Sequence, residues 1–125
     1  MKTLTGGKGV DVVYDPVGGE LALQALKSLA YKGRHLVIGF TSGTIPEFPA
    51  NLALLKSASI VGVYWGDWAA REPGAHAGNL RELAGMLAKG TLRPRVTATF
   101  GLDDYREAFR TIAERRVLGK IVFRF

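Results

Sequence analysis

The amino-acid sequence predicts an α/β protein built on a parallel sheet, and three observations lead to this prediction. A short apolar strand, Val10–Asp15, breaks at Pro16, and two glycines then lead into an amphipathic stretch at residues 20–30. A second apolar run at residues 35–39 completes a strand–helix–strand unit of about 30 residues, the unit that joins neighbouring parallel strands. Only nine residues precede the first strand, and the chain contains no G-x-G-x-x-G turn. We therefore expect the second half of a doubly wound sheet, in which ligands bind beyond the carboxyl ends of the strands.

The composition is that of an ordinary globular domain. The chain has 125 residues, of which 47% are hydrophobic and 22% are charged, and this length is enough for one domain with its own core. No apolar run approaches the roughly 18 residues that a membrane span needs, and the first residues lack the apolar segment of a signal peptide. Because the sequence contains no cysteine, no disulfide framework can form. We expect a cytoplasmic protein without membrane association.

The net charge of +6 raises the question of a nucleic-acid partner. The Lys and Arg residues are scattered along the chain, and only Arg115 and Arg116 are adjacent. Proteins that bind nucleic acids usually gather such charges on one face. We therefore expect no nucleic-acid partner, and an anionic cofactor phosphate is the better use for one or two of these charges.

The first elements follow from hydrophobic periodicity. Residues Val10–Asp15 form a nearly continuous β-branched and aromatic run, which is typical of a strand buried on both faces of a parallel sheet. Apolar residues at helical spacing predict a helix over residues 20–30, with a stop at Gly33. The run at residues 35–39 predicts the second strand, and residues 40–43 form the loop beyond its end.

A third strand completes the predicted sheet. Asn51 is in position to cap a short helix over residues 52–57. The apolar run at residues 59–65 then predicts the strand, and residues 67–76 form a polar connection that contains Gly and Pro.

The last third of the chain predicts two further helices and two further strands. Residues 79–89 have the pattern of an amphipathic helix, and residues 96–100 alternate as a half-buried strand. Asp103 is expected to cap a helix over residues 103–115, and residues 119–125 close the chain as a strand.

Two loops that follow predicted strands are candidates for a ligand site. In Asp15-Pro-Val-Gly-Gly19, the proline fixes the chain direction and the glycines permit close backbone approach. A tight turn without a ligand explains these residues equally well. In Val37-Ile-Gly-Phe-Thr-Ser-Gly43, a glycine at the strand end would let a flat ring approach the backbone, whose free carbonyl and amide groups could pair with a carboxamide. The alternative there is a loop glycine required by geometry alone.

Other conspicuous residues have simpler explanations. The stretch Gly6-Gly-Lys-Gly9 precedes a strand, whereas a phosphate loop follows a strand and opens a helix, so we expect a surface turn. His35 and His76 have no partners at metal-ligand spacing, and we expect both at the surface. We identify no metal site and no catalytic residue. Three aromatic residues close together in the sequence could line a pocket or an interface: Tyr64, Trp65 and Trp68.

Four stretches, taken in chain order, carry a resemblance to one protein family: Thr5-Gly-Gly-Lys-Gly-Val-Asp-Val-Val-Tyr-Asp-Pro-Val-Gly-Gly19, Lys32-Gly-Arg-His-Leu-Val-Ile-Gly-Phe40, Lys56-Ser-Ala-Ser-Ile-Val-Gly-Val-Tyr64 and Gly119-Lys-Ile-Val-Phe123. Together they resemble the C-terminal part of the medium-chain dehydrogenase/reductase superfamily. The best match within it is the zinc-independent branch, the NADPH:quinone oxidoreductases of the zeta-crystallin type. The stretches are more specific to the superfamily than to this branch.

The resemblance implies a Rossmann cofactor domain with strand order 3-2-1-4-5-6. Residues 1–125 would hold strands 4, 5 and 6 of this partial NAD(P)-binding domain, and a C-terminal helix and strand that return to the catalytic domain. Members of the family place the nicotinamide-ribose side of NADPH against the loops after these strands. Carried over to this sequence, the cofactor contacts are Val17, Gly18, Ile38, Gly39, Phe40, Val63, Tyr64 and Trp65, with Lys120 as a looser candidate for a phosphate contact.

The resemblance also implies hydride transfer from NADPH to a quinone or a related enone. Because the family's N-terminal catalytic domain and glycine-rich turn are not in this chain, we expect the isolated chain to be inactive. The alternative is a stand-alone, non-catalytic α/β module that binds a nucleotide or a partner. Two subunits of the family commonly join their sheets at the strand formed here by residues 59–65, so we expect a homodimer through that edge.

Overall fold

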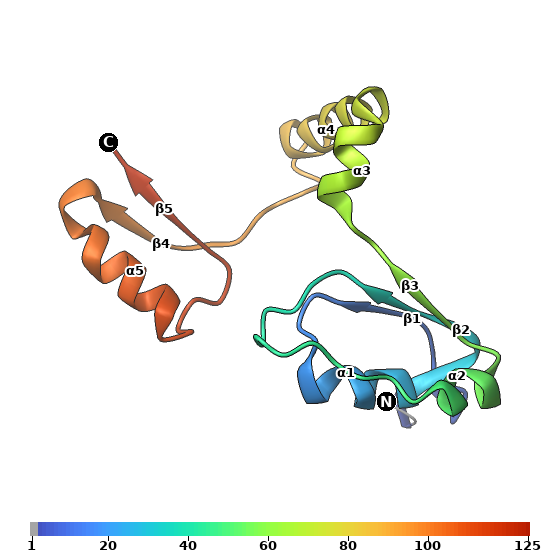
Figure 1. Ribbon diagram of the computed structural model, residues 1–125. Helices are drawn as coiled ribbons and strands as arrows, with labels where there is room; N and C mark the ends of the chain where they lie inside the picture. Colours follow the sequence, from blue (N-terminus) through green and yellow to red (C-terminus); the bar gives the residue numbers. More distant parts are fainter. Residues whose placement is uncertain (1–2) are drawn as a thin grey trace. The chain divides into compact units, whose positions relative to one another are not determined.

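Strands of the chain are arranged in two separate parallel sheets, as seen in a computed structural model that describes residues 3–125 (Figure 1). The chain divides into a first unit that ends at Glu72 and a second unit that begins at Pro73. The first unit contains η1 (Thr3–Thr5), β1 (Val10–Asp15), α1 (Gly19–Ser28), β2 (Leu29–Val37), α2 (Ala50–Lys56), β3 (Ser59–Gly62) and α3 (Trp65–Arg71). The second contains α4 (Pro73–Ala88), β4 (Val96–Gly101), η2 (Leu102–Asp104), α5 (Tyr105–Ala113) and β5 (Lys120–Arg124).

The sheet of the first unit has the strand order β1-β2-β3, and both strand pairs are parallel. Tyr14 lies opposite Leu36 in the neighbouring strand, and Leu36 lies opposite Val61. Helices α1 and α2 lie on the same side of this sheet (Figure 1). The α/β fold and the parallel order of the three predicted strands are therefore confirmed.

The core of the first unit lies between the sheet and its helices. Leu26 of α1 and Leu29 of β2 are fully buried there. Because side chains alternate along a strand, the other face of the sheet carries the intervening residues, and Tyr14 is 68% exposed. Beside the free edge of β1 lies a pocket of about 600 Å³ that Tyr14 and Leu21 help to line. One face of the sheet is therefore covered by helices, whereas the other face and the β1 edge expose apolar side chains.

The second unit is built around a strand–helix–strand motif. Strands β4 and β5 pair in parallel, and α5 connects them (Figure 1). Ala108 of α5 is buried, and the rings of Phe100 and Phe123 lie on adjacent strands with centroids 6.5 Å apart. Phe109, the next residue of α5, is 62% exposed.

The boundary between α1 and β2 differs from the prediction. The helix ends at Ser28, and β2 begins at once with Leu29, which has an extended backbone. Buried apolar residues such as Leu29 and Ala30 fit a helix face and a buried strand equally well, so periodicity alone could not place this boundary. The strand is irregular in its first half, where Lys32 adopts a left-handed conformation with φ 62°.

The predicted third strand and polar connection are partly wrong. Strand β3 ends at Gly62, three residues before the predicted end of the strand. The predicted connection at residues 67–76 is instead helical and belongs mostly to α3 and to the start of α4. An ion pair one helical turn apart, with 2.7 Å between Arg71 Nε and Asp67 Oδ2, supports α3. Pro73 is tolerated at the first position of α4. Proline lacks a backbone N–H, and an N–H at the first position of a helix has no partner within the helix.

Two predicted helix caps are not observed. Pro49 precedes α2 where Asn51 was expected, and no side-chain hydrogen bond caps that helix. Asp103 lies within η2, and Asp104 precedes α5, again without a side-chain cap. Helix α2 follows an extended residue, Pro49, and therefore begins before Asn51. Helix α5 follows the 3-10 turn η2, which already contains Asp103.

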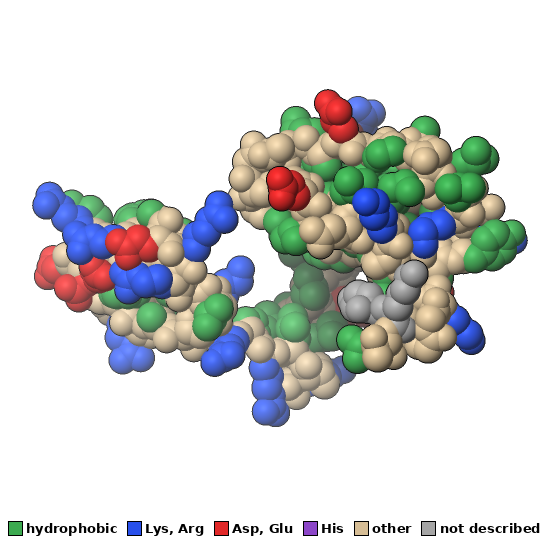
Figure 2. Space-filling model, turned by 90° about the horizontal axis from the view of Figure 1, so that it is seen from below, with side chains coloured by type: hydrophobic (Ala, Val, Ile, Leu, Met, Phe, Trp, Pro, Cys, Tyr) green, Lys and Arg blue, Asp and Glu red, His purple; other side chains and the backbone are tan. Residues whose placement is uncertain are grey.

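Two surface properties bear on possible partners. Within the described part of the chain, no helix is both long and apolar enough to cross a membrane. Where Figure 2 shows the surface of each unit, Lys and Arg side chains lie among apolar, acidic and other groups.

Candidate functional site

The turn after β1 is organised by the carboxylate of Asp15. One oxygen, Oδ1, accepts hydrogen bonds from the backbone N–H groups of Val17 and Gly18, each at 2.9 Å. Aspartate commonly binds its own backbone two or three residues further on in this way. Asp15 is only 8% exposed, so the conformation of the turn is set from inside the protein.

The second carboxylate oxygen of Asp15 faces a buried histidine. His35 Nε2 lies 3.1 Å from Asp15 Oδ2, and the His35 side chain is 0% exposed. The prediction of a surface position for His35 is therefore wrong. His35 of β2 lies opposite Val13 of β1. Because side chains alternate between the two faces of a sheet, His35 points to the helix-covered face, where Asp15 is also buried. His76 lies in α4 rather than in the predicted connection, and it is half-buried there.

The surroundings of Asp15 favour its ionised form. Burial is the largest single influence and would raise its pKa, because it disfavours the charged carboxylate. The hydrogen bonds from Gly18, Val17 and His35 together outweigh burial, so the pKa of Asp15 lies below its ordinary value of 3.8. Asp15 is therefore a hydrogen-bond acceptor at neutral pH.

The loops after β1 and β2 are joined by backbone hydrogen bonds. The N–H groups of Ile38, Thr41 and Ser42 donate to the carbonyls of Asp15, Pro16 and Val17, respectively, at 2.9 to 3.1 Å. In the opposite direction, Gly19 N–H donates to the carbonyl of Thr44 at 3.0 Å. The two loops, predicted as separate candidates, therefore form one structure at the carboxyl ends of the strands.

Gly18 lies where these loops are closest. Its φ of 70° is unfavourable for residues that have a Cβ, and a Cβ there would lie 2.9 Å from Phe40 Cδ1 and 3.0 Å from the Thr44 carbonyl oxygen. The backbone of Gly18 thus lies directly against the ring of Phe40. Glycine is required at this position both by conformation and by space.

A pocket of about 360 Å³ opens at the ends of β2 and β3. Five of the predicted cofactor contacts line it: Ile38, Gly39, Phe40, Val63 and Tyr64. Two further lining residues, Val37 and Gly62, were not predicted as contacts. They are the last residues of β2 and β3. Their position at the carboxyl ends of parallel strands is the sequence signal that indicates them.

The other predicted contacts have different positions. Val17 and Gly18 do not line the pocket, and Gly18 meets it only through Phe40. Trp65 begins α3 and is 58% exposed. Lys120 begins β5 in the second unit, where its N–H donates to the Arg95 carbonyl at 2.8 Å. Its role as a phosphate contact stays a prediction.

The pocket offers mainly carbon surface. The N–H of Ile38 is held by the Asp15 carbonyl, and the N–H of Val63 is held by the Val37 carbonyl, each at 2.9 Å. The N–H of Gly39 also donates to the Asp15 carbonyl, at 3.4 Å, so the expected free amides are not found at these three residues. Two glycines and two aromatic side chains, Phe40 and Tyr64, are among the lining residues of the pocket, and such a lining suits a flat uncharged ring.

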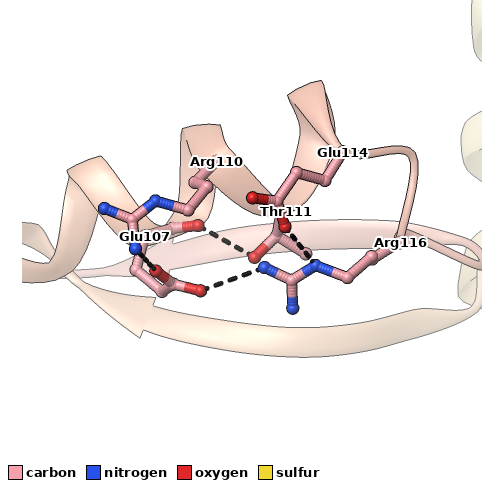
Figure 3. Close-up of polar contacts among 5 residues, drawn as sticks. All are labelled: Glu107, Arg110, Thr111, Glu114 and Arg116. Carbon is pink, nitrogen blue, oxygen red and sulfur yellow. Dashed lines mark hydrogen bonds and ion pairs between the residues drawn. The ribbon is translucent and has the colours of Figure 1, made fainter.

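A polar cluster of the second unit has a different character (Figure 3). Arg116 is paired with Glu114 at 2.7 Å and with Glu107 at 3.2 Å, and Arg110 contacts Glu107 at 3.0 Å. The hydrogen bonds to Glu114 and Glu107 raise the pKa of Arg116 above its ordinary value. All four side chains are about half exposed or more, so the cluster braces the turn after α5 from the surface.

Comparisons with known proteins agree with this geometry. The profile of a family described as zinc-binding dehydrogenase matches residues 1–123. Quinone oxidoreductase-like protein 2 of Bos taurus is 40% identical over 119 residues, which are 95% of this chain and 34% of that protein. The chain thus spans about a third of the length of the relatives that it matches.

Two of the solved structures that share this fold bear on its function. A mycobacterial protein determined in complex with NADPH has a TM-score of 0.82 and 25% identity, over 98% of this chain and 38% of that one. A quinone oxidoreductase of Pseudomonas syringae pv. tomato has a TM-score of 0.77 and 29% identity, over 98% and 38% of the two chains.

The parallel sheet and the joined loops at its carboxyl edge define a Rossmann-type cofactor domain. The chain belongs to the zinc-binding dehydrogenase family and corresponds to the C-terminal, NADP-binding half of the medium-chain dehydrogenases/reductases. The family description implies zinc, but residues 3–125 contain no group of three or more His, Cys, Asp or Glu that could hold a metal ion. The described residues therefore do not fit a zinc site.

Proposed function

We propose that this chain forms the part of an NADPH-dependent reductase that receives the nicotinamide end of the cofactor. The observation that carries the proposal is the pocket at the ends of β2 and β3, where five predicted cofactor contacts meet. The resemblance to a protein determined with NADPH supports the choice of cofactor. Similar proteins named quinone oxidoreductase-like or quinone oxidoreductase support a quinone or related enone as the small-molecule substrate.

The residues of the chain have positioning roles in this proposal. Phe40 and Tyr64 line the ring site with aromatic side chains, and the apolar side chains of Ile38 and Val63 exclude water from it. Bound NADPH supplies the hydride. Val17, Gly18 and Trp65 are proposed contacts for the ribose side, and Lys120 for a phosphate.

Activity is proposed for the whole protein rather than for these residues alone. Together, residues 1–125 are proposed to form a partial cofactor domain with a C-terminal extension. The chain covers only about a third of the length of its quinone oxidoreductase-like relative. Orientation of the substrate against the cofactor supplies a large part of the rate of such reactions. We expect purified chain to show no NADPH turnover with a simple quinone, and turnover above a protein-free blank would contradict this expectation.

Pairing of two copies through β3 is the proposed assembly. This strand is an edge of its sheet, and Ile60 and Val61 are 40% and 37% exposed. Unpaired edges with apolar side chains readily add a further strand. Ile60→Lys should reduce the fraction of dimer measured by light scattering at tens of micromolar, whereas Asp11→Lys on the exposed side of β1 is the control. A single-chain mass for the unmodified protein would contradict the proposal.

The proposed ring site is tested by titration of ¹⁵N-labelled chain with nicotinamide mononucleotide. Amide signals of Ile38, Phe40 and Tyr64 should shift. Because Gly62 lines the pocket and a Cβ there would meet nothing within 4 Å, Gly62→Val should obstruct the ligand while its Cβ meets no protein atom. Ser59→Val adds the same side chain to an exposed position of the same strand and should leave binding unchanged. Shifts confined to other residues, or equal effects of the two variants, would contradict the proposal.

Whole NADPH provides a second measurement. Without the glycine-rich turn that anchors a pyrophosphate, we expect a dissociation constant of about 1 mM or weaker, which corresponds to about 4 kcal/mol or less. Calorimetry of this chain beside the complete Pseudomonas relative measures the difference. Micromolar binding by this chain would support the alternative of a nucleotide-binding module that needs no further anchor.

A further inference from the structure

The imidazole of His35 is buried beneath the two loops and does not reach the ring pocket. Its Nε2 faces Asp15 Oδ2 at 3.1 Å, and its ring meets the ring of Phe48 edge-on, with 5.0 Å between centroids. Its other nitrogen, Nδ1, is buried and has no hydrogen-bond partner among the described residues. The side chain therefore uses one of its two polar atoms and leaves the other unpaired.

The unpaired nitrogen shows which contact matters. A buried polar atom without a hydrogen-bond partner has an energetic cost. A leucine or phenylalanine would fill the same space without this cost, so the benefit of histidine at position 35 must come from Nε2 and its contact with Asp15. The Phe48 ring limits rotation of the imidazole and keeps Nε2 directed at the carboxylate.

A short series of contacts connects this pair to the pocket. Asp15 Oδ2 is held by His35, and this leaves Oδ1 directed at the N–H groups of Val17 and Gly18. The Gly18 backbone lies against the ring of Phe40, and Phe40 lines the pocket. A rotation of the carboxylate would release both N–H groups and the support behind Phe40.

We propose that His35 is a positioning residue, which acts through Asp15 to fix the turn at residues 16–18 and thereby the Phe40 wall of the pocket. This role of His35 rests on the proposed function only for the identity of the ligand, a nicotinamide ring. Because Asp15 occupies both N–H groups, the turn supports an uncharged ring through packing and offers no donors there to a phosphate.

Amide hydrogen exchange of the full ¹⁵N-labelled chain tests this role without a ligand. In His35→Phe, which keeps a ring but loses the donor, exchange at Val17 and Gly18 should accelerate at least tenfold relative to amides of the β1–β2 ladder. In His35→Gln, an amide nitrogen with reach similar to Nε2 should restore most of the protection. The ladder amides separate a local effect from a loss of global stability.

The outcomes are distinct. Equal acceleration at loop and ladder amides, without rescue by glutamine, would mean that His35 only fills space and would overturn the proposal. If His35→Phe does not fold, Phe48→Leu is used instead: faster exchange at Val17 and Gly18 relative to the ladder supports the proposal, and an unchanged ratio overturns it. Nicotinamide mononucleotide is then added to each variant. If the exchange result holds but the ligand shifts no pocket amide, the proposed function fails and the positioning role stands.

Discussion

The two units use the same strand–helix–strand motif but place their polar groups differently. In the first unit, β1, α1 and β2 bury a carboxylate and an imidazole at the ends of the strands. In the second, β4, α5 and β5 carry their charged groups on the surface, where Arg116 joins two glutamates (Figure 3). Buried polar pairs fix one local conformation because a broken pair finds no water, whereas exposed pairs exchange with solvent at little cost. The difference indicates that the loops of the first unit, and not those of the second, are built for a fixed geometry.

Replacement of the buried carboxylate should have the largest effect on this comparison. Asp15→Ala removes the acceptor of two N–H groups and leaves His35 buried without its partner. We expect the free energy of unfolding of the first unit to fall by about 3 kcal/mol. Urea unfolding followed by tryptophan fluorescence measures it, because Trp65 and Trp68 both belong to this unit. Asp11→Ala, at an exposed position of the same strand, is the control; equal losses in both variants would remove the distinction between buried and exposed groups.

Contact between the loops should have the next largest effect. Gly18→Ala imposes an unfavourable φ and a clash with Phe40 and the Thr44 carbonyl, for an expected cost of about 2 kcal/mol. Gly43 has a similar φ of 85° but open space around it, so Gly43→Ala should lose only the backbone part, about 1 kcal/mol. The same urea experiment compares them. Similar costs for the two variants would show that the close approach of the loops does not contribute.

Acid should weaken the first unit through Asp15. Its pKa is lowered in the folded state from 3.8, so the unfolded chain binds the proton more readily. The resulting stabilisation is complete above the unfolded-state pKa and is lost as the pH falls through the lower, folded-state pKa. Urea unfolding between pH 6 and pH 2 should therefore show a steeper acid loss in the unmodified chain than in Asp15→Asn, which does not titrate. Parallel curves would contradict the pKa shift.

The surface cluster of the second unit should have the smallest effect. Glu107→Gln removes the charge that Arg110 and Arg116 share, but all three side chains are open to water. We expect no resolvable change in urea unfolding followed by far-UV circular dichroism, because exposed ion pairs contribute little to stability. Added salt, which screens such pairs further, should leave the two unfolding curves equal. A loss as large as that of Asp15→Ala would overturn the comparison between the units.

Most of the fold could be predicted because it depends on local patterns. Apolar runs placed β1, β3, β4 and β5 in approximately the right segments, and the parallel order brought Ile38 and Tyr64 to the same edge although they are distant in the sequence. Besides the helix boundary and caps described above, two failures have separate causes. Gly66 and Gly74 are weak helix formers and concealed α3 and the start of α4. The burial of His35 depends on Asp15, twenty residues away, and a polar residue gives no periodic signal that would indicate such a partner.

The pairing of strands also has a consequence for synthesis of the protein. Within residues 3–125, each strand pairs only with strands close to it in the chain, and no pairing crosses the boundary at Glu72. Because the entropy lost on loop closure grows with loop length, these pairings cost less than pairings between the two ends of the chain. The first unit can thus complete its sheet, its buried pair and both loops while Pro73–Phe125 is still on the ribosome. The order of folding would then follow the order of translation.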